Sequence, residues 1–160
     1  MIEPTDDLEL RAEQYLIKGQ LMEQNQKYKE AIAFYSRALP LEPTDPDVWY
    51  LINNNLGYCL NRFEEFTRGE EYCRAAIGLD PNRHNAYKNL AIALEGQGQF
   101  ADAIEAYVEA VRHRPEDPRA LAHLEDLLVR NPSFLVENPE LSEIVLVCQE
   151  AVSIATGEET

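Results

Sequence analysis

Apolar and small residues recur at helical spacing on both sides of a short polar break between residues 85 and 115. They are Tyr87, Leu90, Ala91 and Leu94 before the break, and Phe100, Ala103, Ile104, Tyr107, Ala110 and Val111 after it. The break runs from Gly96 to Gln99, and Pro115 closes the second run. Spacing of three to four residues predicts two short amphipathic helices joined by a tight turn. Such a pair has more apolar surface than it can bury alone, so we expect neighbouring helices.

The same columns of residues recur twice upstream. The reference columns are positions 91, 100, 103, 107, 110 and 115. One repeat earlier, these columns hold Gly57, Phe66, Gly69, Cys73, Ala76 and Pro81. Two repeats earlier, they hold Gly19, Tyr28, Ala31, Tyr35, Ala38 and Pro43. The first step is 34 residues and the second is 38, with the extra four near Thr44 to Trp49. Four residues are close to one helical turn, so this addition lengthens a helix without rotating its face.

The columns resemble the tetratricopeptide repeat (TPR), whose pattern W-x2-L-G-x2-Y…A-x3-F…P recurs every 34 residues. The first column, usually Trp, holds Tyr15, Asn53 and Tyr87, so the middle copy departs from the pattern. The resemblance implies an all-α fold of about eight helices, wound as a right-handed α-α superhelix, in a single domain over residues 1–160. We expect repeats at about 12–45, 50–83 and 84–117, a partial fourth repeat at 118–131, and a capping helix at about 140–155.

The helix ends follow from capping and proline signals. Thr5 is a plausible capping hydroxyl for a first helix that runs to about Glu23, and a second helix is expected from Lys29 to Leu39. Pro139 would break a helix placed across it, so the last helix is expected to begin at about Glu140. Its apolar stripe is Leu141, Val145, Cys148 and Val152. For Trp49, packing against the preceding repeat is favoured over an exposed anchor for a partner.

The composition excludes several classes of partner. The chain carries 29 acidic and 14 basic residues, for a net charge of −15, which argues against nucleic acid and an anionic membrane surface. The acidity serves solubility or, alternatively, steers a basic partner. No apolar run approaches transmembrane length, and residues 1–7 lack the basic start of a signal peptide. Three scattered cysteines then indicate a reduced, cytoplasmic protein without a metal site.

No group of residues predicts catalysis. Gly96-Gln97-Gly98 falls between two helices and does not follow a strand, so it is a turn and not a phosphate-binding loop. The three histidines show no metal-ligand spacing. We therefore expect a protein that is not an enzyme and that needs no cofactor.

In the family that the chain resembles, the first helix of each repeat lines a concave groove in which partners lie as extended peptides. The resemblance implies a groove lined by Gln20, Asn54, Asn55, Tyr58, Arg62, Asn85, Lys88 and Asn89. Asn55 and Asn89 hold equivalent places 34 residues apart, similar to the asparagine ladder of some peptide-binding members. An Asn amide can donate to and accept from a peptide backbone. We expect both side chains to be solvated in the free protein.

Other members grip a terminal carboxylate through five Lys, Asn and Arg positions. Only Asn55 matches that set, because Leu16, Gln20, Asn85 and Asn89 stand at the other four places. Binding of that kind is therefore not expected. Two alternatives to peptide binding in the groove stay open. One is a small TPR chaperone for secreted substrates, as in type III secretion, and the other is a self-associating scaffold or accessory subunit.

Overall fold

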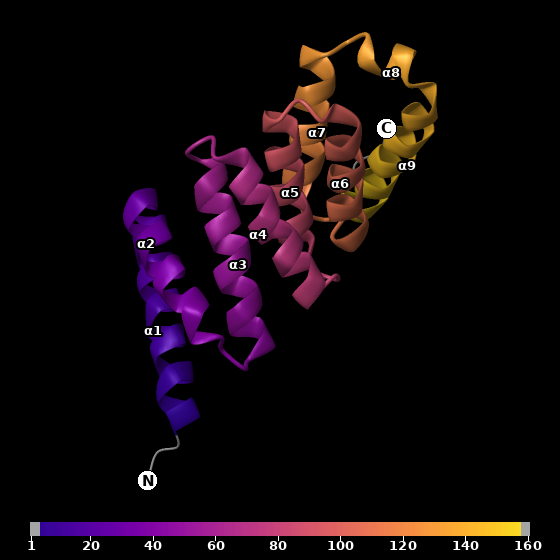
Figure 1. Cartoon of the computed structure of the whole chain (residues 1–160). Helices are drawn as coiled ribbons and strands as arrows, with labels where there is room; N and C mark the ends of the chain where they lie inside the picture. The colour runs from indigo at the N-terminus through magenta and orange to yellow at the C-terminus, as the bar shows by residue number, and fades with distance from the viewer. Residues whose placement is uncertain (1–3, 158–160) are drawn as a thin grey trace. The chain divides into compact units, whose positions relative to one another are not determined.

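A computed structural model describes residues 4–157 of the chain. The helices in order are α1 (Pro4–Gln24), α2 (Tyr28–Ala38), α3 (Pro46–Asn61), α4 (Phe66–Leu79), α5 (His84–Gly96), α6 (Phe100–His113), α7 (Pro118–Arg130), α8 (Phe134–Glu137) and α9 (Pro139–Thr156) (Figure 1). A 3-10 turn, Leu39–Leu41, follows α2. The described part of the chain contains no strand, which confirms the all-α fold. The short α8 was not expected, and Thr5 has no described side chain, so its capping is outside these residues.

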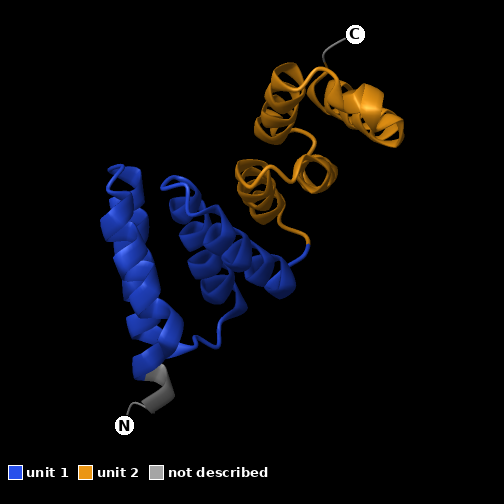
Figure 2. Ribbon diagram, turned by 45° about the horizontal axis from the view of Figure 1, so that its top comes forward, with its two compact units in different colours: residues 1–81 blue, residues 82–160 orange. Residues whose placement is uncertain are grey.

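The chain divides into two compact units, residues 1–81 and residues 82–160 (Figure 2). The first unit contains α1 to α4, in which α1 pairs with α2 and α3 pairs with α4. The second contains α5 to α9, in which α5 pairs with α6. None of the helices within residues 4–157 combines the length and apolarity needed to cross a membrane.

Small residues in the first unit let the paired helices approach closely. A Cβ added to Gly19 would collide with the ring of Tyr35, which is fully buried between α1 and α2. A Cβ added to Gly57 of α3 would lie 2.6 Å from the Sγ atom of Cys73 on α4. The glycine column therefore marks the height at which each pair crosses, and the aromatic or cysteine column fills the space that the missing side chain leaves.

Alanines play the same role in the second unit. Ala91 of α5 and Ala103 of α6 are 0% exposed, and Ala110 is 1% exposed. At the other end of this unit, α9 packs on α6 and α7 and begins at Pro139, the first helical position, where its missing N–H is tolerated. The apolar stripe predicted for this helix is confirmed, since each of its four members is 6% exposed or less. Phe134 of α8 meets Phe100 edge to face at 5.9 Å.

Candidate partner-binding site

Five of the predicted binding residues lie in the first unit. Gln20 is on α1, Asn54, Asn55 and Tyr58 are on α3, and Arg62 is the residue that caps the end of α3. Arg62 is exposed, and Gln20, Asn55 and Tyr58 are partly exposed. Asn54 is only 7% exposed. The four accessible side chains are therefore the ones that a partner can reach directly.

A chain of hydrogen bonds runs from α3 to the end of α1. Asn54 Nδ2 donates to Asn55 Oδ1 at 3.0 Å, and Asn55 Nδ2 donates to the hydroxyl of Tyr35 at 3.4 Å. That hydroxyl donates to Glu23 Oε2 at 2.9 Å. Burial, together with the neighbouring Glu23 carboxylate, raises the pKa of Tyr35. A buried hydroxyl needs such partners, so Asn55 serves the fold while it keeps one N–H and one lone pair for a ligand.

Tyr28, Tyr58 and Arg62 form a cluster of two aromatic rings and a guanidinium in the same unit. The rings of Tyr28 and Tyr58 meet edge to face at 6.0 Å, and Arg62 Cζ lies 5.3 Å from the centre of the Tyr28 ring. Burial raises the pKa of Tyr58 to about 12, and a hydrogen bond with Tyr28 contributes to the increase. The cluster is uncharged apart from Arg62. It combines the residue types that dominate the binding energy of protein interfaces.

In the second unit, Asn85 belongs to a polar group at the start of α5 and α7. Asp117 caps α7 by accepting from the Arg119 backbone N–H at 3.1 Å, and it also bonds the Arg119 side chain and His84 Nε2, the latter at 3.0 Å. Arg119 in turn donates to Asn85 Oδ1 at 3.4 Å. The hydrogen bonds from Arg119 hold the pKa of Asp117 well below its usual range. Burial lowers the pKa of His84, against the opposing effect of Asp117.

The two remaining predicted residues, Lys88 and Asn89, are less accessible than expected. Burial lowers the pKa of Lys88, and Arg119 adds to that effect. Asn89 is 3% exposed, so the expectation that it is solvated is wrong. The reason is its place on α5, where it shares a face with Ala86 and Ala93, both 0% exposed, one turn away on either side. Asn55 remains partly exposed, so the two asparagines differ in depth.

Sequence reasoning missed a pair of residues that recurs in both units. Tyr107 donates to Glu95 Oε2 at 2.8 Å, which repeats the bond from Tyr35 to Glu23. In both cases the tyrosine follows the glutamate by 12 residues, and the two glutamates hold the same column of the repeat. The middle repeat has Asn61 and Cys73 in these columns. Twelve residues separate the end of one helix from the middle of the next, so the spacing itself was a detectable signal.

Comparisons with known proteins identify tetratricopeptide repeats in this chain. Three models of the tetratricopeptide repeat match residues 12–54, 50–83 and 84–117. The chain is 31% identical over 117 residues to the tetratricopeptide repeat-containing protein trd-1 of Caenorhabditis elegans, which is 73% of this chain and 14% of that protein. It spans 13% of two uncharacterized TPR repeat-containing proteins of Arabidopsis thaliana. The chain therefore matches only a small part of these relatives.

Solved structures show the same fold at low sequence identity. The first TPR of Spaghetti (RPAP3), bound to the HSP90 peptide SRMEEVD, matches 78% of this chain and 96% of its own length, with a TM-score of 0.69 and 22% identity. The Hsp90 co-chaperone Cns1 from Saccharomyces cerevisiae matches 82% of this chain and 43% of its own length, with a TM-score of 0.72 and 20% identity. At such identities the likeness concerns the fold alone.

Proposed function

This chain belongs to the tetratricopeptide repeat family, and from that premise we propose that it is a non-catalytic interaction module for a partner peptide or protein segment. The partner binds to the first helices of the repeats. One solved relative is bound to an HSP90 peptide, and another is named as an Hsp90 co-chaperone, which supports a polypeptide as the ligand. The module works without a cofactor, in the cytoplasm.

The observation that carries this proposal is the cluster of Tyr28, Tyr58 and Arg62. Tyr58 and Arg62 are predicted binding residues, and Tyr28 of α2 lies against both of them. All three side chains are at least partly exposed. Aromatic and guanidinium groups supply large contact areas at a low cost in side-chain entropy. Around them, Gln20 and Asn55 offer hydrogen bonds to a peptide backbone.

In the second unit, Asn85 and Lys88 provide the corresponding polar contacts. Lys88 is partly buried, so its ammonium group gains more from a hydrogen-bond acceptor on the partner than a fully solvated lysine would. Asn54 and Asn89 are nearly buried and support the neighbouring groups from within.

The test begins with a partner captured from native lysate, identified, and titrated calorimetrically as a purified segment. We expect Tyr58→Ala to weaken its binding about tenfold or more. Phe34→Ala is the matched control, because Phe34 on α2 also carries a guanidinium, that of Arg37 at 6.0 Å, outside the predicted columns. Equal affinities of the wild type and Tyr58→Ala for every identified partner would contradict this placement of the site.

Self-association is a second candidate function, and a specific observation on α1 favours it. Leu10, Ile17 and Leu21 are 53%, 63% and 51% exposed and form one stripe. On α3, the equivalents of the two leucines are Val48 and Cys59, which are buried. The preceding helix α2 packs on α3, the helix that carries Val48 and Cys59. The stripe of α1 is an equivalent apolar face that remains exposed in the described structure. Light scattering at rising concentration should show dimers that Ile17→Glu abolishes; a monomeric wild type would exclude this function.

A further inference from the structure

Glu23 and Glu95 occupy the same column of the repeat, yet among the described residues only Glu95 has a cationic partner. Each accepts a tyrosine hydroxyl on Oε2, at 2.9 Å from Tyr35 and at 2.8 Å from Tyr107. The other oxygen of Glu95 forms an ion pair with the guanidinium of Arg130. Within the described residues, Glu23 pairs with no cation. The first unit therefore holds a partly buried carboxylate with one oxygen left for a guest.

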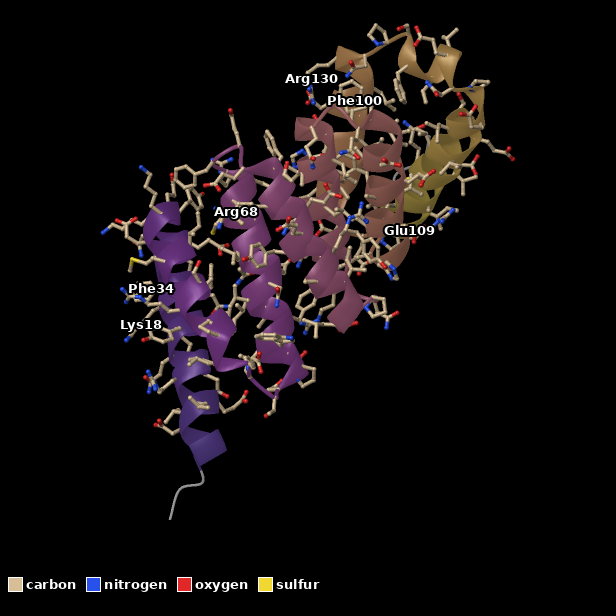
Figure 3. All side chains as sticks on the ribbon, in the orientation of Figure 1. Lys18, Phe34, Arg68, Phe100, Glu109 and Arg130 are labelled. Carbon is tan, nitrogen blue, oxygen red and sulfur yellow. The ribbon has the colours of Figure 1, made fainter. Side chains whose placement is uncertain are left out.

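Arg62 holds the repeat position from which an arginine could pair with Glu23, but its guanidinium lies over an aromatic ring. Arg62 is the repeat equivalent of Arg130, and Figure 3 labels Arg130 at the end of α7. Arg130 also donates to Asp126, one turn earlier, at 2.8 Å, and this second carboxylate holds it in place. The equivalent of Asp126 in the first unit is Tyr58, which has no charge to offer. Arg62 lies instead over the Tyr28 ring.

We propose that the free oxygen of Glu23 binds the guanidinium of an arginine side chain on the partner, in the arrangement that Arg130 shows on Glu95. This inference rests on the proposed function and names the chemistry of its ligand. The hydroxyl of Tyr35 donates to the other oxygen of Glu23 at 2.9 Å and so orients the carboxylate for its guest. The site is linked to Asn55 through the hydroxyl of Tyr35.

The electrostatics of the site suit such a guest. Burial raises the pKa of Glu23, which means that its charge is poorly solvated in the free protein. A guanidinium that binds there replaces the lost solvation and forms charge-assisted hydrogen bonds. A guanidinium also matches a carboxylate better than an ammonium does, because its donors form a planar fork. The net charge of −15 attracts a basic segment from a distance.

The first test uses a probe in place of the partner. N-acetyl-arginine-N-methylamide is titrated into the full-length chain and followed by amide chemical shifts, with the citrulline analogue as a neutral probe of the same shape. We expect saturable shifts around Glu23 and Tyr35 with the arginine probe alone. Glu23→Gln keeps an acceptor for Tyr35 and should weaken the probe at least tenfold. Glu13→Gln removes the same charge from the same helix and should change the affinity less than twofold. Equal binding to all three proteins, or no saturable shift, would overturn the proposal.

Arg62 supplies a prediction of opposite sign. Its guanidinium repels an incoming cation, so Arg62→Gln should tighten the arginine probe. Tyr58→Asp places a carboxylate one turn before Arg62, as Asp126 lies one turn before Arg130. Arg62 should then pair with Glu23 and block the binding of the arginine probe. Unchanged or weaker probe binding in Arg62→Gln would count against the proposal.

The partner itself separates this inference from the proposed function. Each arginine of an identified partner segment is replaced in turn by citrulline. One replacement should weaken binding to the wild type about tenfold and have no effect on binding to Glu23→Gln. If a segment binds through Tyr58 but is insensitive to every replacement, the function stands and the arginine site is wrong. If the arginine probe binds at Glu23 while no polypeptide partner uses Tyr58, the arginine site stands and the proposed function is wrong.

Discussion

Gly57→Ala provides a sharp test of how the first unit is packed. The added methyl group would lie 2.6 Å from Cys73 Sγ and 3.1 Å from the carbonyl oxygen of Gly69 on α4. Ordinary contacts between such atoms are about 3.5–4.0 Å, so the two helices must separate. Cys73 is 0% exposed and its side chain is short, so it has little room to move.

The magnitude follows from two opposing effects. Alanine is favoured over glycine in a helix interior by about 1 kcal/mol, whereas overpacking of a tight contact costs about 1–3 kcal/mol. We expect net destabilisation of about 1 kcal/mol. Gly78→Ala is the control, because a Cβ at Gly78 of α4 would meet nothing within 4 Å, so it should stabilise by about 0.5–1 kcal/mol.

The assay is urea unfolding followed by fluorescence. Trp49, the only tryptophan of the chain, lies on α3 and therefore reports on the unit that contains both glycines. With a denaturant dependence of about 1 kcal/mol/M for so small a unit, the two variants should differ in midpoint by about 1–3 M. Cys73→Ala removes the closest atom, so Gly57→Ala should cost less in that background. Midpoints that rise equally in both single variants would refute this account of the glycine column.

Four further predictions concern the second unit and the charge of the chain. Ala103→Leu should destabilise by about 1–3 kcal/mol in thermal unfolding, because Ala103 is fully buried; an unchanged melting temperature would mean that α6 is misplaced. Removal of residues 140–160 should expose apolar surface of α6 and α7 and cause aggregation in light scattering; a stable monomer would make α9 an appendage. Asp117→Asn should destabilise at pH 7, with the difference from wild type shrinking steadily as the pH falls below about 4, because the folded-state pKa of Asp117 is depressed and its contribution is lost on protonation; a difference independent of pH would exclude this ion pair. Association with a basic partner should slow as salt rises while dissociation changes little, and a salt-independent rate would leave solubility as the role of the acidity.

Much of the fold was accessible from local signals. Pro139 and the stripe of Leu141 to Val152 predicted the last helix almost to the residue, because proline position and apolar spacing act on the chain itself. The same holds for the pairing of α5 with α6, which Ala91 and Ala103 indicated through their size. The short α8 was missed because a four-residue helix carries too little periodicity to detect.

The candidate site was only partly accessible in this way. The pattern assigned Asn55 and Asn89 to equivalent positions, and it treated them as equally solvated. The structure shows one bonded to Tyr35 and partly exposed, and the other nearly buried. Equivalence within a repeat predicts which face a residue occupies, but its depth depends on what packs against that face.

The amino-acid sequence by itself determined the repeat register, the helix order and the positions where helices cross closely, since these depend on spacing, residue size and backbone preference along one chain. The tertiary structure alone decided where equivalent charged side chains point. Arg130 lies on Glu95 because Asp126 stands one turn away, whereas Arg62 lies on an aromatic ring because Tyr58 stands there instead. A long flexible side chain adopts the position with the lowest total electrostatic and packing energy, and that total includes groups from several helices at once.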